Sequence, residues 1–139
     1  MELILALICI LLAYLLGSLS AAILLAKLLD LPDPTSVGSG NPGATNMLRI
    51  SSKKVAALVL LLDMLKGALA VYLAQLIGLA DLYLILVACA VFLGHLYPVF
   101  FDFKGGKGVA TALGVCLALS GKMAVILVAV WLGVAALTR

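Results

Sequence analysis

Long apolar runs dominate this sequence and limit its fold more than any other feature. From Met1 to Leu29, only Glu2, Lys27 and small polar residues interrupt the apolar residues, and about 20 apolar residues suffice to span a bilayer. Of the 139 residues, 66% are hydrophobic and 11% are charged, whereas soluble domains are roughly half apolar and a quarter charged. A water-soluble fold of this size could not hide so much apolar surface. We therefore expect an all-α integral membrane protein with a single domain over residues 1–139.

The apolar segments predict about five transmembrane helices, at residues 3–28, 55–78, 82–100, 109–119 and 123–138. The connection near Leu79 to Asp81 is too short for anything but an antiparallel hairpin. The last apolar stretch is interrupted at Ser120-Gly121-Lys122. We favour a turn there over one long tilted helix, because the excess length is larger than ordinary tilt absorbs. The short helix 109–119 would then begin below the membrane surface and carry its preceding loop into the bilayer.

The distribution of charge predicts the orientation. Seven of the nine Lys and Arg residues cluster at two loops and the last residue: Lys27, Arg49, Lys53, Lys54, Lys104, Lys107 and Arg139. Glu2 and Asp81 mark the opposite side, with Lys122 as the one cation there. Positive residues favour the cytoplasmic side of short-looped membrane proteins, so we expect an outside N-terminus and two cytoplasmic loops. A cleaved signal peptide is the alternative for the first segment, but Glu2 stands where a basic region belongs.

Metal and cofactor chemistry find no support in the residue types. Cys9, Cys89 and Cys116 all lie within apolar segments without metal-ligand spacing, and we interpret them as packing residues. His95 is the one histidine, which excludes a two-histidine metal site. We expect no metal, no cofactor and no nucleic-acid partner.

The first glycine-rich segment, residues 36–46 and here called loop one, reads SVGSGNPGATN. Glycine lets main-chain N–H groups converge on an anion. From Ala44 onward a helix is expected, with Thr45 and Asn46 near its positive end and Arg49 one turn later, which favours anion binding. A flexible connector is the alternative.

The second glycine-rich segment, residues 103–111 and here called loop two, reads FKGGKGVAT. Its three glycines and two lysines lead directly into a helix, which combines main-chain N–H groups, a helix dipole and positive charges. Phosphate is the expected ligand. The Walker A pattern is absent, since Gly108 follows Lys107 where a magnesium-binding hydroxyl would stand, so nucleotide hydrolysis is disfavoured. A basic patch against anionic lipid headgroups is the alternative.

Three ionisable residues fall within the predicted spans. Asp63 and Lys66 lie three residues apart on one helix face, and charges in the hydrocarbon normally face the bundle interior and pair. The two form either a buried pair, with Gly67 allowing close helix contact, or part of a polar cavity reached from inside. His95, near the inner end of its segment, is either a base or phosphate ligand or a residue that stabilises the helix end.

Four blocks in this order resemble the bacterial acyl-phosphate:glycerol-3-phosphate acyltransferase family, PlsY. They are GSGNPGATN at 38–46 followed by Arg49, then Asp63-x-x-Lys66-Gly67, then Gly94-His95-x-Tyr97-Pro98, and FKGGKGVATALG at 103–114. The resemblance spans essentially the whole chain. It implies transfer of a fatty acyl group from acyl phosphate to glycerol 3-phosphate, giving lysophosphatidic acid and phosphate, in the first acylation of bacterial phospholipid synthesis at the inner membrane.

The resemblance also implies roles for individual residues. In the family, the serine and arginine of the first loop are needed for activity, which maps onto Ser39 and Arg49, less directly onto Ser36, and we add His95 as a third catalytic candidate. The glycine-rich second loop is associated with glycerol 3-phosphate binding. The expected substrate-binding residues are Ser36, Gly38, Gly40, Asn41, Gly43, Thr45, Asn46, Lys66, Lys104, Gly105, Gly106, Lys107 and Gly108, with Asp63 in a structural or cavity role.

One feature departs from the family pattern. Family members continue through about two more apolar helices and a basic tail near R-H-R-x-N, which this sequence does not contain. We therefore expect a truncated chain, a remainder supplied by a partner such as another lipid-synthesis enzyme, or an inactive protein. Acyl phosphate, glycerol 3-phosphate and membrane lipids are the expected partners. The rival classes are a small transporter subunit, with Asp63 and Lys66 on an ion path, and a noncatalytic membrane scaffold.

Overall fold

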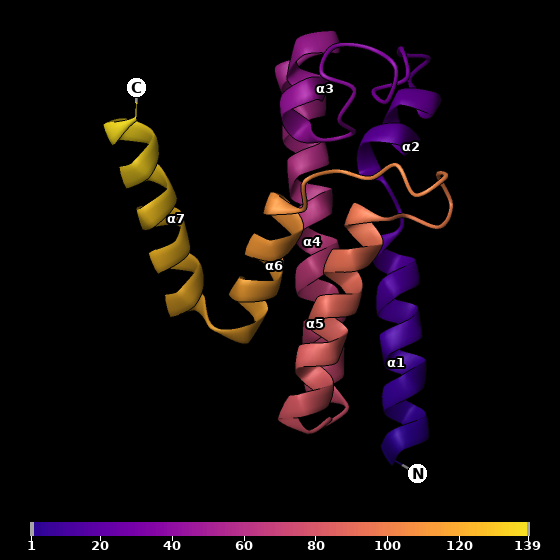
Figure 1. The fold of residues 1–139 in the computed structure, drawn as a ribbon, viewed down its shortest axis with the longest axis vertical. Coiled ribbons are helices and arrows are strands. Elements are labelled where there is room, and N and C mark those ends of the chain that lie inside the picture. The colour runs from indigo at the N-terminus through magenta and orange to yellow at the C-terminus, as the bar shows by residue number, and fades with distance from the viewer. Residues whose placement is uncertain (1, 139) are drawn as a thin grey trace.

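The computed structural model describes residues 2–138, and over that range the chain forms seven helices and no strand (Figure 1). The helices are α1 (Glu2–Gly17), α2 (Ala21–Leu28), α3 (Ala44–Ile50), α4 (Lys53–Leu76), α5 (Asp81–Leu96), α6 (Val109–Leu119) and α7 (Gly121–Leu137). The all-α prediction is confirmed for these residues.

The predicted segment 3–28 is not one helix, and this expectation is wrong. The chain breaks between α1 and α2, which are bent by 47° relative to each other. Ser20 ends the break as the N-cap of α2, where its hydroxyl accepts a hydrogen bond from the main-chain N–H of Ile23. Ser18 also holds the break, since its hydroxyl donates to the carbonyl of Tyr14 and accepts from the N–H of Val99. Small hydroxyl residues thus replace the helical main-chain bonds that the break removes.

Two predicted turns are confirmed. Helix α6 ends at Leu119 and α7 begins at Gly121, with Ser120 as the N-cap of α7, so the apolar stretch 109–137 is split and not one long helix. Gly78, which has a positive φ of 78°, lies in the short connection between α4 and α5. That connection forms the predicted antiparallel hairpin.

The helices differ in their capacity to cross a membrane. Among the described residues, α4 alone is a single helix long and apolar enough to span a bilayer, and the bent pair α1 and α2 would make a second span if counted together. Helices α5, α6 and α7 are apolar but shorter. The number of five spans therefore stays a prediction.

Glycines on facing helices bring the bundle together. Any side chain at Gly17 of α1 would overlap the backbone of Val91 in α5, and one at Gly94 of α5 would overlap the carbonyl of Tyr14. Helices α4 and α6 approach in the same reciprocal way, Gly67 against the carbonyl of Thr111 and Gly114 against that of Met64. Small residues let helix backbones approach closely where lipid provides no hydrophobic drive for association. The predicted role of Gly67 in close helix contact is confirmed.

The two ends of the bundle differ (Figure 1). Loop one and α3 lie at one end of the molecule, and α1 begins at the other. Helix α7 leans away from the bundle and reaches it through α6, and its large apolar side chains are exposed, Val125, Trp131 and Leu137 among them. Loop one therefore lies at the end of the bundle opposite the start of α1.

Candidate functional site

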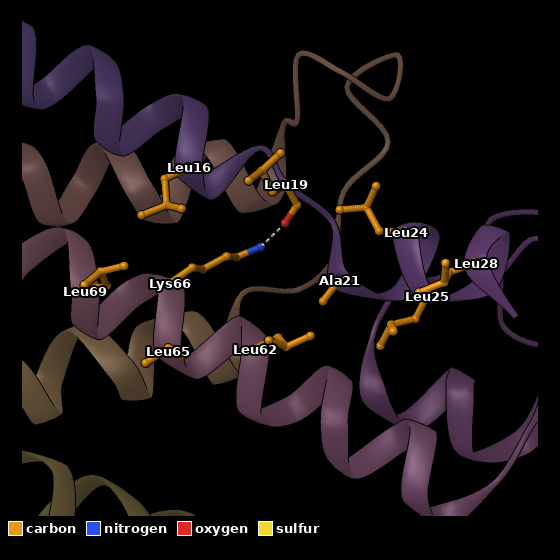
Figure 2. A pocket seen from close by; sticks show the side chains of 10 residues that line it. All are labelled: Leu16, Leu19, Ala21, Leu24, Leu25, Leu28, Leu62, Leu65, Lys66 and Leu69. Atoms are coloured by element: carbon orange, nitrogen blue, oxygen red, sulfur yellow. Dashed lines mark hydrogen bonds between the residues drawn. The ribbon is translucent and has the colours of Figure 1, made fainter.

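Lys66 reaches the break between α1 and α2. Its ammonium donates a hydrogen bond to the carbonyl of Leu19 over 2.7 Å, as Figure 2 shows, and lies 2.9 Å from Oδ1 of Asp63. Lys66 is 6% exposed and Asp63 is 3% exposed. The broken helix thus offers a free carbonyl to a buried cation, and the carboxylate balances the charge. Of the two alternatives from the sequence, the structure shows the buried pair.

Lys66 also borders a groove beside this break. The groove holds about 320 Å³ between α4 and the bent pair α1 and α2. Apart from Lys66 its lining is apolar, as Figure 2 shows: Leu16, Leu19, Ala21, Leu24, Leu25, Leu28, Leu62, Leu65 and Leu69. The groove is thus suited to hydrocarbon and not to a phosphate.

Asp63 also faces His95 from α5. The distance from Oδ1 of Asp63 to Nδ1 of His95 is 3.6 Å, and His95 is 7% exposed. Both of these contacts of Asp63 involve Oδ1, which lies within ion-pair distance of Lys66 but has no partner in hydrogen-bond geometry. We therefore treat the three residues as an electrostatic cluster and not as a chain of ideal hydrogen bonds.

Loop two lies against the end of α5, and glycine makes this contact possible. Any side chain at Gly105 would overlap the main-chain carbonyls of His95 and Leu96, and one at Gly106 would overlap Nε2 of His95. The N–H of Gly106 donates to the carbonyl of His95 over 3.2 Å. Gly108 has a positive φ of 77°, and a side chain there would overlap the ring of Phe92. The glycines thus have a packing task that the sequence did not reveal.

This contact places loop two deep beside α4. His95 meets α4 at Asp63, which lies ten residues after the first residue of that helix, Lys53 (63 − 53). At about 1.5 Å per residue, the contact is roughly 15 Å along the helix from its start. Figure 1 likewise shows the connection from α5 to α6 well below α3. The depth of loop two in the membrane stays a prediction.

Helix α6 begins at the end of loop two without a side-chain cap. Its N-cap is Gly108, which makes no side-chain hydrogen bond to the first turn. The first N–H groups of a helix have no partner within the helix and carry the positive end of its dipole. Lys104 and Lys107, five and two residues before Val109, are both exposed. This end of loop two therefore combines main-chain donors with two cations, as a phosphate site requires.

Loop one is held by the buried side chain of Asn46. Its amide nitrogen donates to the carbonyls of Pro34 and Val37 over 2.9 and 3.0 Å, and its oxygen accepts from the N–H of Ser39 over 2.9 Å. Asn46 is fully buried. Gly38 must be glycine here, because its φ is 64° and a side chain would overlap Oδ1 of Asn46. Asn46 thus fixes the shape of loop one.

A turn at residues 33–36 leads into loop one and was not predicted from the sequence. Oδ1 of Asp33 accepts hydrogen bonds from the N–H and the hydroxyl of Thr35, both over 2.8 Å. These bonds from Thr35 hold the pKa of the Asp33 carboxyl below its usual value, with smaller contributions from the charges of Lys27 and Lys104. The Asp-Pro-Thr-Ser sequence at 33–36 is a signal for such a turn.

The predicted site residues divide by burial. Exposed are Ser36, Gly38, Ser39, Gly40, Thr45, Arg49, Lys104 and Lys107; half-buried are Asn41, Gly43, Gly105 and Gly106; buried are Asn46, Asp63, Lys66, His95 and Gly108. The hydroxyl of Ser36 donates to the carbonyl of Asp33. The polar atoms of Asn46 and Lys66 form hydrogen bonds within the protein, so both residues have a structural role. Their contact with substrate stays a prediction.

The two loops meet at one point. The position next to Gly106 that a side chain would occupy lies 3.3 Å from the carbonyl of Pro42 in loop one. The hydroxyl of Thr111, at the end of loop two, is fully buried and has no hydrogen-bond partner among the described residues. His95, Gly106 and Pro42 therefore join three parts of the chain at one site.

Comparison with known proteins identifies the family of this chain. A protein-family model described as glycerol-3-phosphate acyltransferase matches residues 7–139. The chain belongs to this family. The resemblance inferred from the sequence is confirmed.

Two relatives illustrate the extent of the similarity. The glycerol-3-phosphate acyltransferase of Shewanella oneidensis is 53% identical over 138 residues, which cover 99% of this chain and 68% of the relative. That of Methylobacillus flagellatus is 60% identical over 127 residues, which cover 91% of this chain and 65% of the relative. The chain thus spans about two thirds of the length of these acyltransferases.

Two solved structures share the fold. One is PlsY, described as an integral membrane glycerol 3-phosphate acyltransferase, in its glycerol 3-phosphate form, with a TM-score of 0.86 and 48% identity. The other is the lysophosphatidic acid form, with a TM-score of 0.82 and 46% identity. Each match covers 93% of this chain and 64% of the solved one. The chain is accordingly an integral membrane protein of the acyltransferase family.

Proposed function

We propose that this chain transfers a fatty acyl group from acyl phosphate to glycerol 3-phosphate, giving lysophosphatidic acid and phosphate. The observation that carries the proposal is the meeting of the two glycine-rich loops at Gly106 and Pro42, since the reaction brings together two phosphate-bearing substrates. The similar solved structures were described in forms with glycerol 3-phosphate and with lysophosphatidic acid. Family membership favours this enzyme over the transporter and scaffold alternatives.

The chemistry requires positioning and charge stabilisation. Acyl phosphate is an activated mixed anhydride, so a hydroxyl of glycerol 3-phosphate can attack its carbonyl carbon directly. The new ester C–O bond forms, the bond from the carbonyl carbon to the phosphate oxygen breaks, and the hydroxyl proton passes to a base. Cations and N–H groups stabilise the developing negative charge and hold the reactants together. We propose a single displacement without an acyl-enzyme intermediate.

The residues divide between the two substrates. We propose that loop two holds the phosphate of glycerol 3-phosphate with Lys104, Lys107 and the N–H groups that start α6, because this is where main-chain donors and exposed cations coincide. Ser39 of loop one and Arg49 of α3 are exposed, and we assign them to the acyl phosphate. His95, between the loops, remains our third candidate as a base or phosphate ligand. We place both loops on the cytoplasmic face of the bacterial inner membrane, in accord with their positive charge.

One assay tests the proposal against its rivals. Membranes or purified protein are incubated with acyl phosphate and labelled glycerol 3-phosphate, and lysophosphatidic acid is measured. An acyltransferase forms product, a transporter takes up the label without forming product, and a scaffold does neither. An acyl adduct trapped on Ser39 in a quenched turnover would contradict the single displacement.

A further inference from the structure

The ammonium of Lys66 binds only groups within the protein, and these groups do not belong to loop two. It donates to the carbonyl of Leu19 and pairs with Asp63, and Lys66 is 6% exposed. The groove beside it is otherwise apolar (Figure 2). A buried ammonium in such surroundings needs these partners, since an unpaired charge in low dielectric is costly. Lys66 thus holds the break in place and balances the charge of Asp63 beside it.

The carboxylate of Asp63 also lies close to the imidazole of His95 and acts on it electrostatically. Its Oδ1 lies 3.6 Å from Nδ1 of His95. An ionised carboxylate only accepts hydrogen bonds, so a proton on Nδ1 is favoured and a lone pair there is repelled. The same arrangement is found at metal sites, where a carboxylate that accepts a hydrogen bond from one imidazole nitrogen fixes the tautomer and the orientation of the ring.

The opposite side of His95 supports loop two. Gly106 lies directly against Nε2, and its N–H donates to the His95 carbonyl. The ring and the main chain of His95 together determine where the loop passes beneath Pro42. A rotated ring would occupy the space that Gly106 now fills.

We propose that Asp63 is a positioning residue for loop two: its carboxylate orients the His95 ring, with Nδ1–H toward Asp63, and His95 in turn sets the position of Gly106. The proposal rests on the proposed function to the extent that loop two holds a phosphate group. Asp63 touches no substrate in this assignment, and its effect on binding passes through His95.

The orientation can be measured by ¹⁵N NMR of the imidazole, because the chain has one histidine. The full chain is labelled at histidine, reconstituted in lipid nanodiscs and observed at about pH 8, where an unperturbed imidazole is neutral. We expect the Nδ1–H tautomer, which places a proton toward Asp63. A neutral Nε2–H tautomer in the parent protein would overturn the proposal, and this measurement needs no variant.

The effect on loop two is measured by the affinity for labelled glycerol 3-phosphate and for inorganic phosphate. The double variant Asp63→Leu/Lys66→Met removes both charges at similar volume, so no buried charge is left without a partner. The double variant Asp63→Asn/Lys66→Met also removes both charges but keeps an amide oxygen at position 63 that can accept a hydrogen bond from Nδ1–H. Leu65→Met, next in sequence and 58% exposed, is the neutral control. Circular dichroism and gel filtration establish that each variant is folded.

We expect Asp63→Leu/Lys66→Met to bind glycerol 3-phosphate about tenfold more weakly than Asp63→Asn/Lys66→Met, as is common for residues that orient a ligand-binding group. Equal dissociation constants for these two folded variants would overturn the proposal, because an acceptor at position 63 would then not set the orientation of His95. If either double variant does not fold, the ¹⁵N spectrum of the parent protein decides whether the Nδ1 proton of His95 faces Asp63. If the parent binds neither probe, the proposed phosphate site fails, while the NMR result still decides the orientation of His95.

Discussion

Loop one and loop two are similar in sequence but are held in different ways. Loop one is held by side chains, chiefly the three hydrogen bonds of buried Asn46 and the turn at Asp33. Loop two is held by close packing on the end of α5. This packing is possible because three positions of the loop have no side chain: Gly105, Gly106 and Gly108. A substitution in loop one can remove some hydrogen bonds and leave others in place. A side chain added to a glycine of loop two would overlap neighbouring atoms and displace the loop. We therefore expect substitutions in loop two to have larger effects.

The largest effect is expected for Gly105→Ala. Its methyl group would overlap the carbonyls of His95 and Leu96, which are main-chain atoms that cannot move aside. Overpacking of this kind costs about 1–3 kcal/mol or more, and we expect at least about tenfold weaker binding of glycerol 3-phosphate. Equilibrium binding and product formation both measure the loss. Gly133→Ala in α7 is the matched control, because a methyl group there meets open space; equal effects of the two variants would contradict the packing explanation.

The next largest effect is expected for Asn46→Ala. It removes three hydrogen bonds and leaves the N–H of Ser39 and two carbonyls without this partner. Unmade buried hydrogen bonds cost about 1–3 kcal/mol each when water cannot replace them, so we expect a lower unfolding temperature and an increased exposure of loop one to protease. Thr45→Ala, an exposed neighbour, serves as the control. If Asn46→Ala melts like the parent and only raises the KM for substrate, Asn46 contacts substrate instead.

A functional and not a structural effect is expected for Lys104→Ala. Lys104 is exposed, so its loss should leave the unfolding temperature unchanged. A charge-assisted hydrogen bond to phosphate contributes about 1.5–3 kcal/mol, and the KM for glycerol 3-phosphate should rise by roughly tenfold or more. Steady-state kinetics with each substrate varied in turn measure the change. An unchanged KM for glycerol 3-phosphate with lower turnover would move Lys104 to the acyl-phosphate side.

The smallest effect is expected for the turn at Asp33. Its folded-state pKa is lowered by the bonds from Thr35, so the stabilisation is present above the unfolded-state pKa, about 4, and is lost as the pH falls through the lowered folded-state value. Protection of the Thr35 and Ser36 N–H groups from hydrogen exchange, taken relative to the intrinsic rate at each pH, should therefore fall more at acidic pH in the parent protein than in Asp33→Asn, which lacks the ionised form. An identical pH profile in the two proteins would show that the turn does not depend on the carboxylate.

Several parts of the fold follow from local pattern. The boundaries of α4, α6 and α7 lie within about two residues of the predicted segments, and the turns after Leu76 and at Ser120 are where hydropathy and glycine place them. Family membership followed from four blocks of motif. The break after Gly17 was missed, because residues 1–29 are almost uniformly apolar and small residues there are compatible with a continuous helix.

The sequence by itself determined the class of fold, the glycine-rich cationic loops and the acyltransferase family, because hydropathy, charge and motif spacing are properties of neighbouring residues. Only the tertiary structure decided what these residues contact. Lys66 reaches Leu19 across 47 positions of sequence, and Asp63, His95 and Gly106 meet from α4, α5 and loop two. Such contacts depend on how helices pack in three dimensions. For that reason the glycines of loop two, predicted from their N–H groups, were found to be required for packing on α5 as well.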